Sequence, residues 1–471
     1  MSDLDLMGII KNKGASLQSS FAELLNLVSM ALLLIVILIS ELQLLSIIRV
    51  SLLYTFCTFV FLGYVILDPK RGGVSFILAL QFVLFISVPA TFQISGDLFP
   101  FYARPRLDFM YSGFSILALS QLAIQLGFRV PMGKFKTTPK PKYLSEGYIS
   151  KWAWYLGAFA FFIGLLLGPS YMLSTRGEIG ELTASSDGIQ RQLLFICRSL
   201  GLVAFLMILS MAVHSSSVKY RQRNKLLLFV AIPIFIYLNY PPTLPRTYLI
   251  GPLISITAIF VNYYKTSIKL SLFTLAFPLV YLVLPAIKSL GAGGSLSSIK
   301  DAISIEKIYT YVFRVDFDIY LWTVESLEYI SSGAEYRWGH NFLGVLFFFV
   351  PRSLWPTKPE NTGSLVSSHL GYIYNNVSSP LWAEAYVSLG VLGVIFVMLL
   401  FGIIISTLES RARSYAAGQI VIDNYSYIVL MAFVIIIIRG ALNSVAPSFG
   451  SAFLALFAVY MFGKKRLVWR R

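Results

Sequence analysis

The feature that most constrains this chain is a series of apolar runs, each about as long as a bilayer is thick. A helix needs roughly 20 apolar residues to cross the hydrocarbon core of a membrane. Such runs lie near residues 22–40, 50–67, 74–92, 111–129, 152–172, 193–213, 226–240, 247–264, 268–287, 386–408, 425–439 and 449–463. We therefore predict an all-α polytopic membrane protein with about 12 transmembrane helices and with both termini on one side.

The composition and the placement of charge support a membrane location. Hydrophobic residues make up 57% of the chain and charged residues only 13%, about half of the charged share that is usual in soluble proteins. The net charge of +16 would indicate a nucleic-acid partner in a soluble protein. Here the lysines and arginines gather in the short loops on the side of the termini, which predicts cytoplasmic termini and no nucleic-acid partner.

Motifs that the sequence lacks argue against one class of function and two kinds of site. It contains no P-loop, no dinucleotide-binding glycine motif and no cytoplasmic segment large enough to hydrolyse ATP, so primary active transport is not expected. Cys57 and Cys197 fall within predicted helices, which makes a disulfide or a cysteine-based metal site improbable.

One long external segment divides the chain into three regions: N-terminal helices over 1–287, a loop over 288–385, and C-terminal helices with a basic tail over 386–471. The loop is rich in tryptophan and phenylalanine, unlike a disordered segment. Residues 319–330 predict an amphipathic helix that lies on the membrane surface. Residues 342–350 are apolar but too few to cross, which predicts a re-entrant or interfacial segment.

Arginines on the external side are candidate anion ligands. Arg246 follows a proline-rich turn at the start of a predicted helix, where free N–H groups and the helix dipole attract anions. Arg439 ends an apolar run beside Gly440. Arg191 and Arg314 belong to the same external set, which we predict to bind phosphate. The alternative for each is a side chain that only extends to the membrane interface.

The rest of the candidate site lies in the long loop and just after it. Arg352, Trp355 and Lys358 stand among three prolines. We predict that Arg352 binds pyrophosphate and that Trp355 and Lys358 bind sugars; the alternative is merely a rigid turn. Glu384 lies at the start of a helix, where it either caps the helix or acts as a base. His340 is the other candidate base, although a lone histidine is more often structural.

At these residues the chain resembles the Wzy-type polymerases of bacterial polysaccharide synthesis. The resemblance covers about 240–450 and rests on four short motifs, which are Pro245-Arg246-Thr247, the stretch from Val350 to Pro359, the stretch from Glu384 to Gly393, and Arg439-Gly440.

The resemblance implies a GT-C-like glycosyltransferase of the bacterial inner membrane that polymerises oligosaccharide repeat units linked to undecaprenyl pyrophosphate. Donor and acceptor would both be such lipid-linked glycans, and a chain-length-regulating co-polymerase would be a further partner. The leaving pyrophosphate carries its own charge, so arginines suffice and no metal or other cofactor is expected. An O-antigen ligase, a flippase for lipid-linked oligosaccharides and a non-enzymatic transporter or scaffold remain alternatives.

Overall fold

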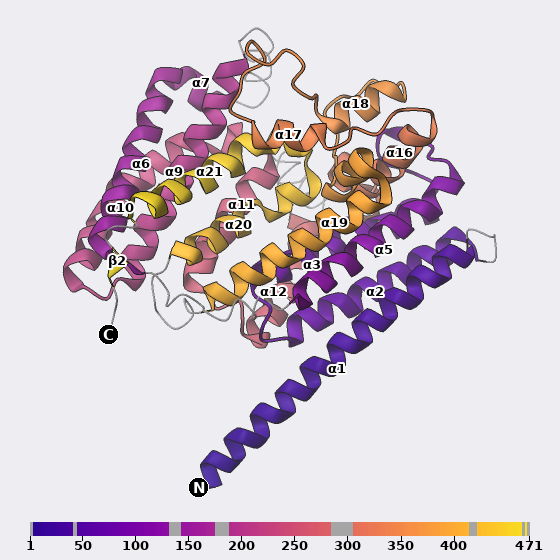
Figure 1. The fold of residues 1–471 in the computed structure, drawn as a ribbon, viewed down its shortest axis with the longest axis horizontal. Coiled ribbons are helices and arrows are strands. Elements are labelled where there is room, and N and C mark those ends of the chain that lie inside the picture. Colours follow the sequence, from indigo (N-terminus) through magenta and orange to yellow (C-terminus); the bar gives the residue numbers. More distant parts are fainter. Residues whose placement is uncertain are drawn as a thin grey trace. The chain divides into compact units, whose positions relative to one another are not determined.

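The computed structural model describes residues 3–40, 45–130, 143–174, 188–283, 305–413, 422–463 and 467–468 (Figure 1). In these ranges 10 helices are long and apolar enough to cross a membrane. Two shorter apolar helices, Tyr248–Phe260 and Asn424–Arg439, correspond to two further predicted spans. The protein is therefore a predominantly helical multi-pass membrane protein, with ten helices of spanning length among the described residues rather than the twelve predicted.

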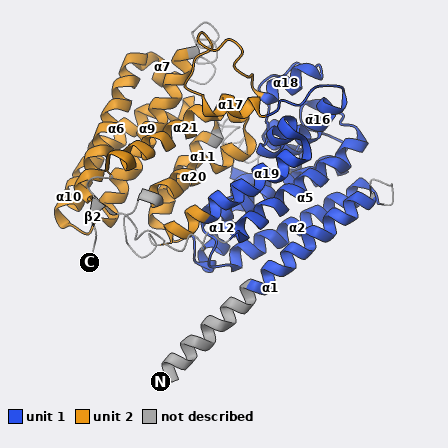
Figure 2. Cartoon of the chain, viewed as in Figure 1, with its two compact units in different colours: residues 1–130, 263–338, 362–406 blue, residues 131–262, 339–361, 407–471 orange. Residues whose placement is uncertain are grey.

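The chain forms two compact units (Figure 2). Unit 1 comprises residues 1–130, 263–338 and 362–406, and unit 2 comprises residues 131–262, 339–361 and 407–471. Each unit thus contains helices from before the long loop, part of the loop, and helices from after it. The predicted three regions follow chain order and stay a prediction, whereas these units follow contacts in space.

Unit 1 is assembled from the first helices of the chain and from much of the long loop. Its helices are α1 (Asp3–Ser40), α2 (Ile47–Leu67), α3 (Gly73–Gln81), α4 (Val88–Ser95), α5 (Leu107–Arg129), α12 (Thr266–Pro278), α15 (Ile305–Tyr311), α16 (Ile319–Ser331), α18 (Thr362–His369) and most of α19 (Leu381–Ala412). A π-helical segment, Phe82–Ser87, joins α3 to α4, and Leu279–Val283 continues α12 in the same form. Short 3-10 turns occur at Pro100–Tyr102 and Val315–Phe317.

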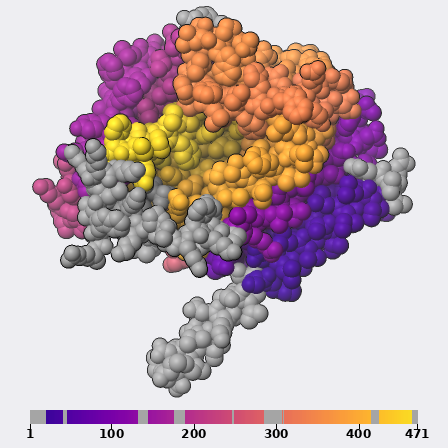
Figure 3. Space-filling model, viewed as in Figure 1, coloured from indigo at the N-terminus to yellow at the C-terminus, as the bar shows by residue number. Residues whose placement is uncertain are grey.

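The α1 helix forms an open apolar flank of unit 1, drawn in indigo in Figure 3. Its described side chains include Phe21, Leu32 and Leu38, which are 68%, 56% and 58% exposed. Such exposure of large apolar side chains fits contact with lipid rather than with water.

The helix α16 confirms one prediction and overturns another. The sequence places a helix here, as observed, but the helix does not lie amphipathically on a surface. Ten of its 13 residues are buried, including Glu325, which is only 2% exposed. One side packs on α5, where the Tyr320 hydroxyl donates to the Met110 carbonyl at 3.0 Å. The Trp382 indole of α19 donates to the Thr323 hydroxyl at 2.9 Å. Glu325 and the preceding Asp318, also 2% exposed, thus face protein.

A buried lysine lies at the end of α2 in unit 1. Lys269, at 0% exposure, donates from Nζ to the carbonyl oxygens of Val65, Asp68 and Arg71 at 2.6, 3.0 and 3.3 Å. These carbonyls belong to the last turn of α2 and the chain beyond it, where a helix leaves acceptors without partners. Lys269 therefore ties α12 to the end of α2.

The helix α19 is broken near its start. Leu389 and Gly390 leave helical geometry, and Gly390 has φ +62° and ψ −151°, a region that essentially only glycine adopts. The break frees the carbonyls of Val387 and Ser388, which accept hydrogen bonds from the backbone N–H groups of Arg337 and Trp338, both at 2.9 Å. An extended piece of the long loop thus completes the interrupted helix.

Unit 2 contains the remaining elements. They are β1 (Tyr143–Leu144), α6 (Glu146–Leu167), α7 (Pro169–Leu173), α9 (Gly188–His214), α10 (Val218–Leu238), a 3-10 turn (Pro241–Thr243), α11 (Arg246–Phe260), α17 (His340–Leu346), α20 (Ile422–Arg439), α21 (Leu442–Gly463) and β2 (Leu467–Val468). The two short strands pair antiparallel, with Tyr143 opposite Val468. The predicted re-entrant segment, 342–350, appears here as the seven-residue α17 followed by a turn, and it packs on the start of α21.

Candidate functional site

Contacts along the helices of unit 2 show which ends lie together. Phe195 of α9 meets Tyr248 of α11, with ring centroids 6.1 Å apart, and His214 at the end of α9 contacts the Ile259 carbonyl at 2.7 Å. The two helices therefore run parallel, and both begin at the same end of the unit. The Tyr248 hydroxyl hydrogen-bonds Ser448, which brings the start of α21 to this end as well.

This end of unit 2, at which α9, α11 and α21 begin and α20 finishes, is called the arginine end below. Arg191 stands in the first turn of α9, Arg246 is the first residue of α11, and Arg439 is the last residue of α20. The structure therefore brings together the ends of three helices that carry predicted anion ligands, although the Arg246 side chain lies outside the described part of the chain. Arg314 belongs to unit 1, where it is exposed.

Arg198 lies deeper at the same end and is only 6% exposed. Its Nε donates to the Leu238 carbonyl at 3.2 Å, and its Nη2 donates to the Thr243 hydroxyl at 2.7 Å. Both acceptors are neutral, so these bonds position the guanidinium without cancelling its charge. A buried charge inside a membrane helix is costly, and it ordinarily marks a functional site.

Two tyrosines accompany Arg198. Tyr171 of α7 and Tyr248 of α11 both interact electrostatically with Arg191 and Arg198. Tyr171 is 7% exposed, and its hydroxyl has no hydrogen-bond partner among the residues that the structure describes. A buried hydroxyl normally has a partner. The arginine end thus combines buried positive charge with a hydroxyl group that still has a hydrogen bond to make.

Two cationic side chains of the segment 348–359 donate hydrogen bonds to backbone carbonyls of the same segment. Lys358 donates from Nζ to the carbonyls of Phe348 and Val350 at 2.9 and 2.8 Å, while Arg352 donates to the carbonyls of Lys358 and Pro359 at 2.7 and 3.2 Å. Partial burial and the neighbouring Arg352 lower the pKa of Lys358. Both predicted ligands therefore stabilise the turn, and Arg352 remains exposed at its surface.

The predicted sugar-binding residue Trp355 is half-buried beside a candidate base. Its ring lies edge-on to His340, with centroids 6.0 Å apart, and its indole N–H donates to the Thr357 hydroxyl at 3.1 Å. The same part of unit 2 is fastened to the start of α21, because Asn361 donates to Ser444 at 2.8 Å. His340 and Trp355 thus belong to the arginine end of unit 2.

Glu384 belongs to unit 1 and is fully buried at 0% exposure. It stands in the first turn of α19, as predicted, and its Oε2 accepts a hydrogen bond from the Thr362 hydroxyl at 2.5 Å. The carboxylate is thus directed at α18, so its observed partner is a side chain of the long loop.

Two residues with possible functional roles, Arg198 and Glu325, were not predicted from the sequence. Arg198 reads as one cation within an apolar run, and nothing local reveals that Leu238 and Thr243 fix it in place. Glu325 reads as the polar side of a surface helix, yet it is buried and accepts from the Tyr372 hydroxyl at 2.9 Å. Burial raises the pKa of Glu325 to about 7. The only sequence signal was the placement of acidic residues within a very aromatic segment.

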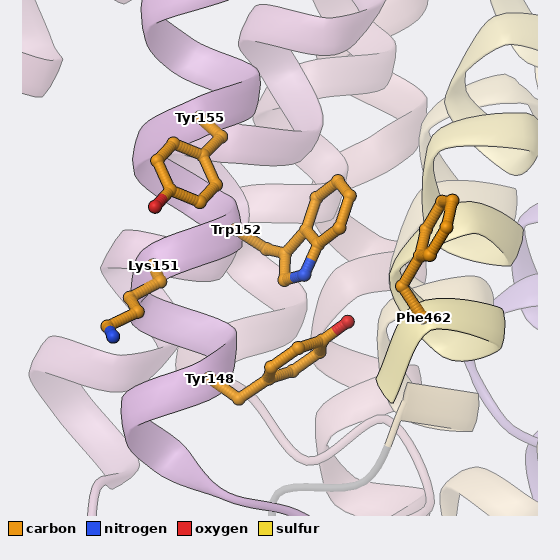
Figure 4. A pocket seen from close by; sticks show the side chains of 5 residues that line it. All are labelled: Tyr148, Lys151, Trp152, Tyr155 and Phe462. Atoms are coloured by element: carbon orange, nitrogen blue, oxygen red, sulfur yellow. The ribbon is translucent and has the colours of Figure 1, made fainter. Parts of the chain in front are cut away.

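A shallow cavity of about 390 Å³ lies elsewhere in unit 2 (Figure 4). It is lined by Tyr148, Lys151, Trp152, Tyr155 and Phe462. Figure 4 shows the Trp152 ring facing Phe462, on which it stacks at 5.7 Å, while Lys151 points away. These residues lie near the start of α6, where Glu146 bonds the serines after α9. The cavity is therefore at the end of α9 opposite to Arg191.

Within the described ranges, no group of three or more His, Cys, Asp or Glu side chains is placed to hold a metal ion. No known protein family, characterised protein or solved structure matches this chain.

Proposed function

We propose that the protein is a glycosyltransferase of the bacterial cytoplasmic membrane that joins lipid-linked oligosaccharide repeat units into a surface polysaccharide. Its termini are cytoplasmic, the reaction takes place at the outer face, and undecaprenyl pyrophosphate carries both the donor and the acceptor glycan. A co-polymerase that regulates chain length is a further expected partner. The large external loop and the GT-C-like arrangement of helices belong to the same proposal.

The observation that carries the proposal is the buried charge of Arg198. Its described hydrogen-bond acceptors are neutral, and Arg191, the start of α11 and Arg439 lie at the same end of the unit. A pyrophosphate bound there would supply the missing negative charge. At an effective dielectric constant near 20, one such charge pair about 4 Å apart contributes roughly 4 kcal/mol before desolvation. Stabilisation of this size at a leaving group is an effective means of catalysis.

The reaction needs few other groups. The acceptor hydroxyl oxygen attacks the anomeric carbon of the donor, the bond from that carbon to the pyrophosphate oxygen breaks, and the pyrophosphate leaves with the electron pair. A base takes the hydroxyl proton, for which Glu384 and His340 are the candidates. Trp355 offers an aromatic face for a sugar, and Lys358 and Arg352 shape the turn that presents it.

The proposal is tested in cells that make the polysaccharide. We expect Arg198→Gln and Arg439→Gln to abolish the polymer ladder and leave single repeat units on the surface, at unchanged protein level. Arg106→Gln is the matched control, because Arg106 is exposed and pairs with Asp108 at 3.4 Å. A normal ladder in both variants would refute the assignment. Polymer retained on the lipid carrier would indicate a ligase instead, and repeat units trapped inside would indicate a flippase.

A further inference from the structure

The segment of residues 362–380 comprises α18 and the chain up to α19 and is called the cover segment below. Hydroxyl groups fasten it to the rest of unit 1, to which it belongs. The Thr362 hydroxyl donates to Glu384 at 2.5 Å and the Tyr372 hydroxyl to Glu325 at 2.9 Å. Ser378 donates to Asp318 from both its hydroxyl and its backbone N–H, at 2.6 and 3.2 Å. Each acceptor is a carboxylate that is at most 2% exposed.

Two of these carboxylates lie on one side of α16, one at the residue before its start and one within it, together with a tryptophan. Asp318, Trp322 and Glu325 follow each other at intervals of four and three residues, which places them on one side of a helix. Contacts agree, because the Tyr372 ring meets the Trp322 ring edge-on at 5.5 Å while its hydroxyl reaches Glu325.

Two buried polar groups, one on this face and one in the cover segment, lack hydrogen-bond partners among the described residues. The Trp322 indole N–H, in a side chain only 1% exposed, has no acceptor among the described residues, and the Ser379 hydroxyl, 2% exposed, has no partner there either. Buried donors of this kind normally make hydrogen bonds. The cover segment therefore does not satisfy all the hydrogen-bonding groups at this face of α16.

An aromatic wall completes the arrangement. The Phe101 ring lies 6.0 Å from Trp322 and 4.9 Å from Tyr374. Phe101 has φ +62°, a conformation that costs a residue other than glycine about 1–3 kcal/mol and that gathers at ligand sites. Flat rings beside carboxylates match the two surfaces of a sugar, which presents apolar C–H groups on its faces and hydroxyls on its rim.

We propose that the face of α16 carrying Asp318, Trp322 and Glu325 is a binding site for a sugar of a glycan, and that the cover segment closes it by placing its own hydroxyls on the carboxylates. The bound sugar replaces those hydroxyls and accepts the Trp322 N–H. This inference rests on the proposed function for the identity of the glycan, which is the acceptor repeat unit.

The test measures binding of an oligosaccharide to the purified full-length protein by calorimetry. The probe is the oligosaccharide released by mild acid from the lipid-linked glycans of the producing cells, free of lipid and phosphate. At pH 8, above the pKa of Glu325 of about 7, we expect Glu325→Gln to weaken binding about tenfold or more, because a hydrogen bond to a charged group contributes roughly 1.5–3 kcal/mol. Trp322→Phe keeps the ring, loses the N–H and weakens binding as well.

The decisive variant removes the competing hydroxyl. Tyr372→Phe is expected to strengthen binding by up to about tenfold. Only molecules in which the cover segment is open bind the sugar, and loss of the Tyr372 hydroxyl raises the fraction of open molecules. Tyr320→Phe is the matched control: its hydroxyl bonds Met110 on the other side of α16, and the affinity should not change.

Absence of binding to the wild-type protein would overturn the inference. Equal weakening by Glu325→Gln and Tyr372→Phe would also overturn it, because a purely structural hydrogen bond is lost when either of its two partners is replaced. The proposed function fails separately. If Arg198→Gln leaves the polymer ladder intact while the oligosaccharide still binds, the reaction is wrong and the sugar site stands. If Arg198→Gln abolishes the ladder but Glu325→Gln binds the oligosaccharide normally, the sugar site is wrong and the proposed reaction stands.

Discussion

The break in α19 allows a sharp prediction, because it depends on one glycine. Gly390 has φ +62° and ψ −151°, and a Cβ added there would lie 3.3 Å from the Tyr336 hydroxyl. Alanine would have to adopt this backbone at a cost of roughly 1–3 kcal/mol, or the helix would straighten. Straightening withdraws the carbonyls of Val387 and Ser388 from the N–H groups of the long loop, and each such bond contributes about 0.5–1.5 kcal/mol.

Both routes lead to a similar expected result. Gly390→Ala should lower the free energy of unfolding by about 2 kcal/mol, since either the strain or the two lost hydrogen bonds amount to that. The measurement is unfolding of the purified protein in mixed micelles by dodecyl sulfate.

A matched control makes the same chemical change without the strain. Gly63 lies inside α2, and a Cβ there would meet nothing within 4 Å. Gly63→Ala should stabilise the protein by roughly 0.5–1 kcal/mol, because alanine loses less backbone freedom in a helix. If Gly390→Ala also stabilises the protein, the broken helix is not what holds the loop, and the reasoning is refuted.

Three further changes test the packing of unit 1. Lys269→Met should cost about 3 kcal/mol of unfolding free energy, because three carbonyl oxygens lose a buried charged donor. Trp382→Phe should cost roughly 1–3 kcal/mol by the same measurement, since the bond to Thr323 and part of the ring are lost. The pKa of Glu325 is about 7 against an ordinary 4.5, so the folded state binds the proton more tightly, and stability falls as pH rises from about 4.5 to 7. Glu325→Gln should remove most of that fall, about 3 kcal/mol, and an unchanged pH dependence of unfolding would contradict this.

Hydropathy alone predicts most of the transmembrane architecture, because the requirement for about 20 apolar residues is local. The agreement is less complete at 247–264 and 425–439, where the structure has apolar helices shorter than the other ten. The proximity of the helix ends that carry Arg191, Arg246 and Arg439 could not be read from the chain, since it depends on α9 and α11 running parallel and on α20 ending beside them. Spacing in sequence carries no information about such packing between distant helices.

The error at α16 has a physical origin that also bears on function. Periodicity assumes that acidic residues face water, whereas Asp318 is covered by Ser378 and Glu325 by Tyr372, which lie 60 and 47 residues further along the chain. Apolar side chains would hold the cover segment at least as well, because burying a carboxylate costs free energy that its hydrogen bonds only offset. Acidic groups kept beneath a segment that satisfies them with hydroxyls are therefore better explained by a ligand that presents hydroxyls of its own.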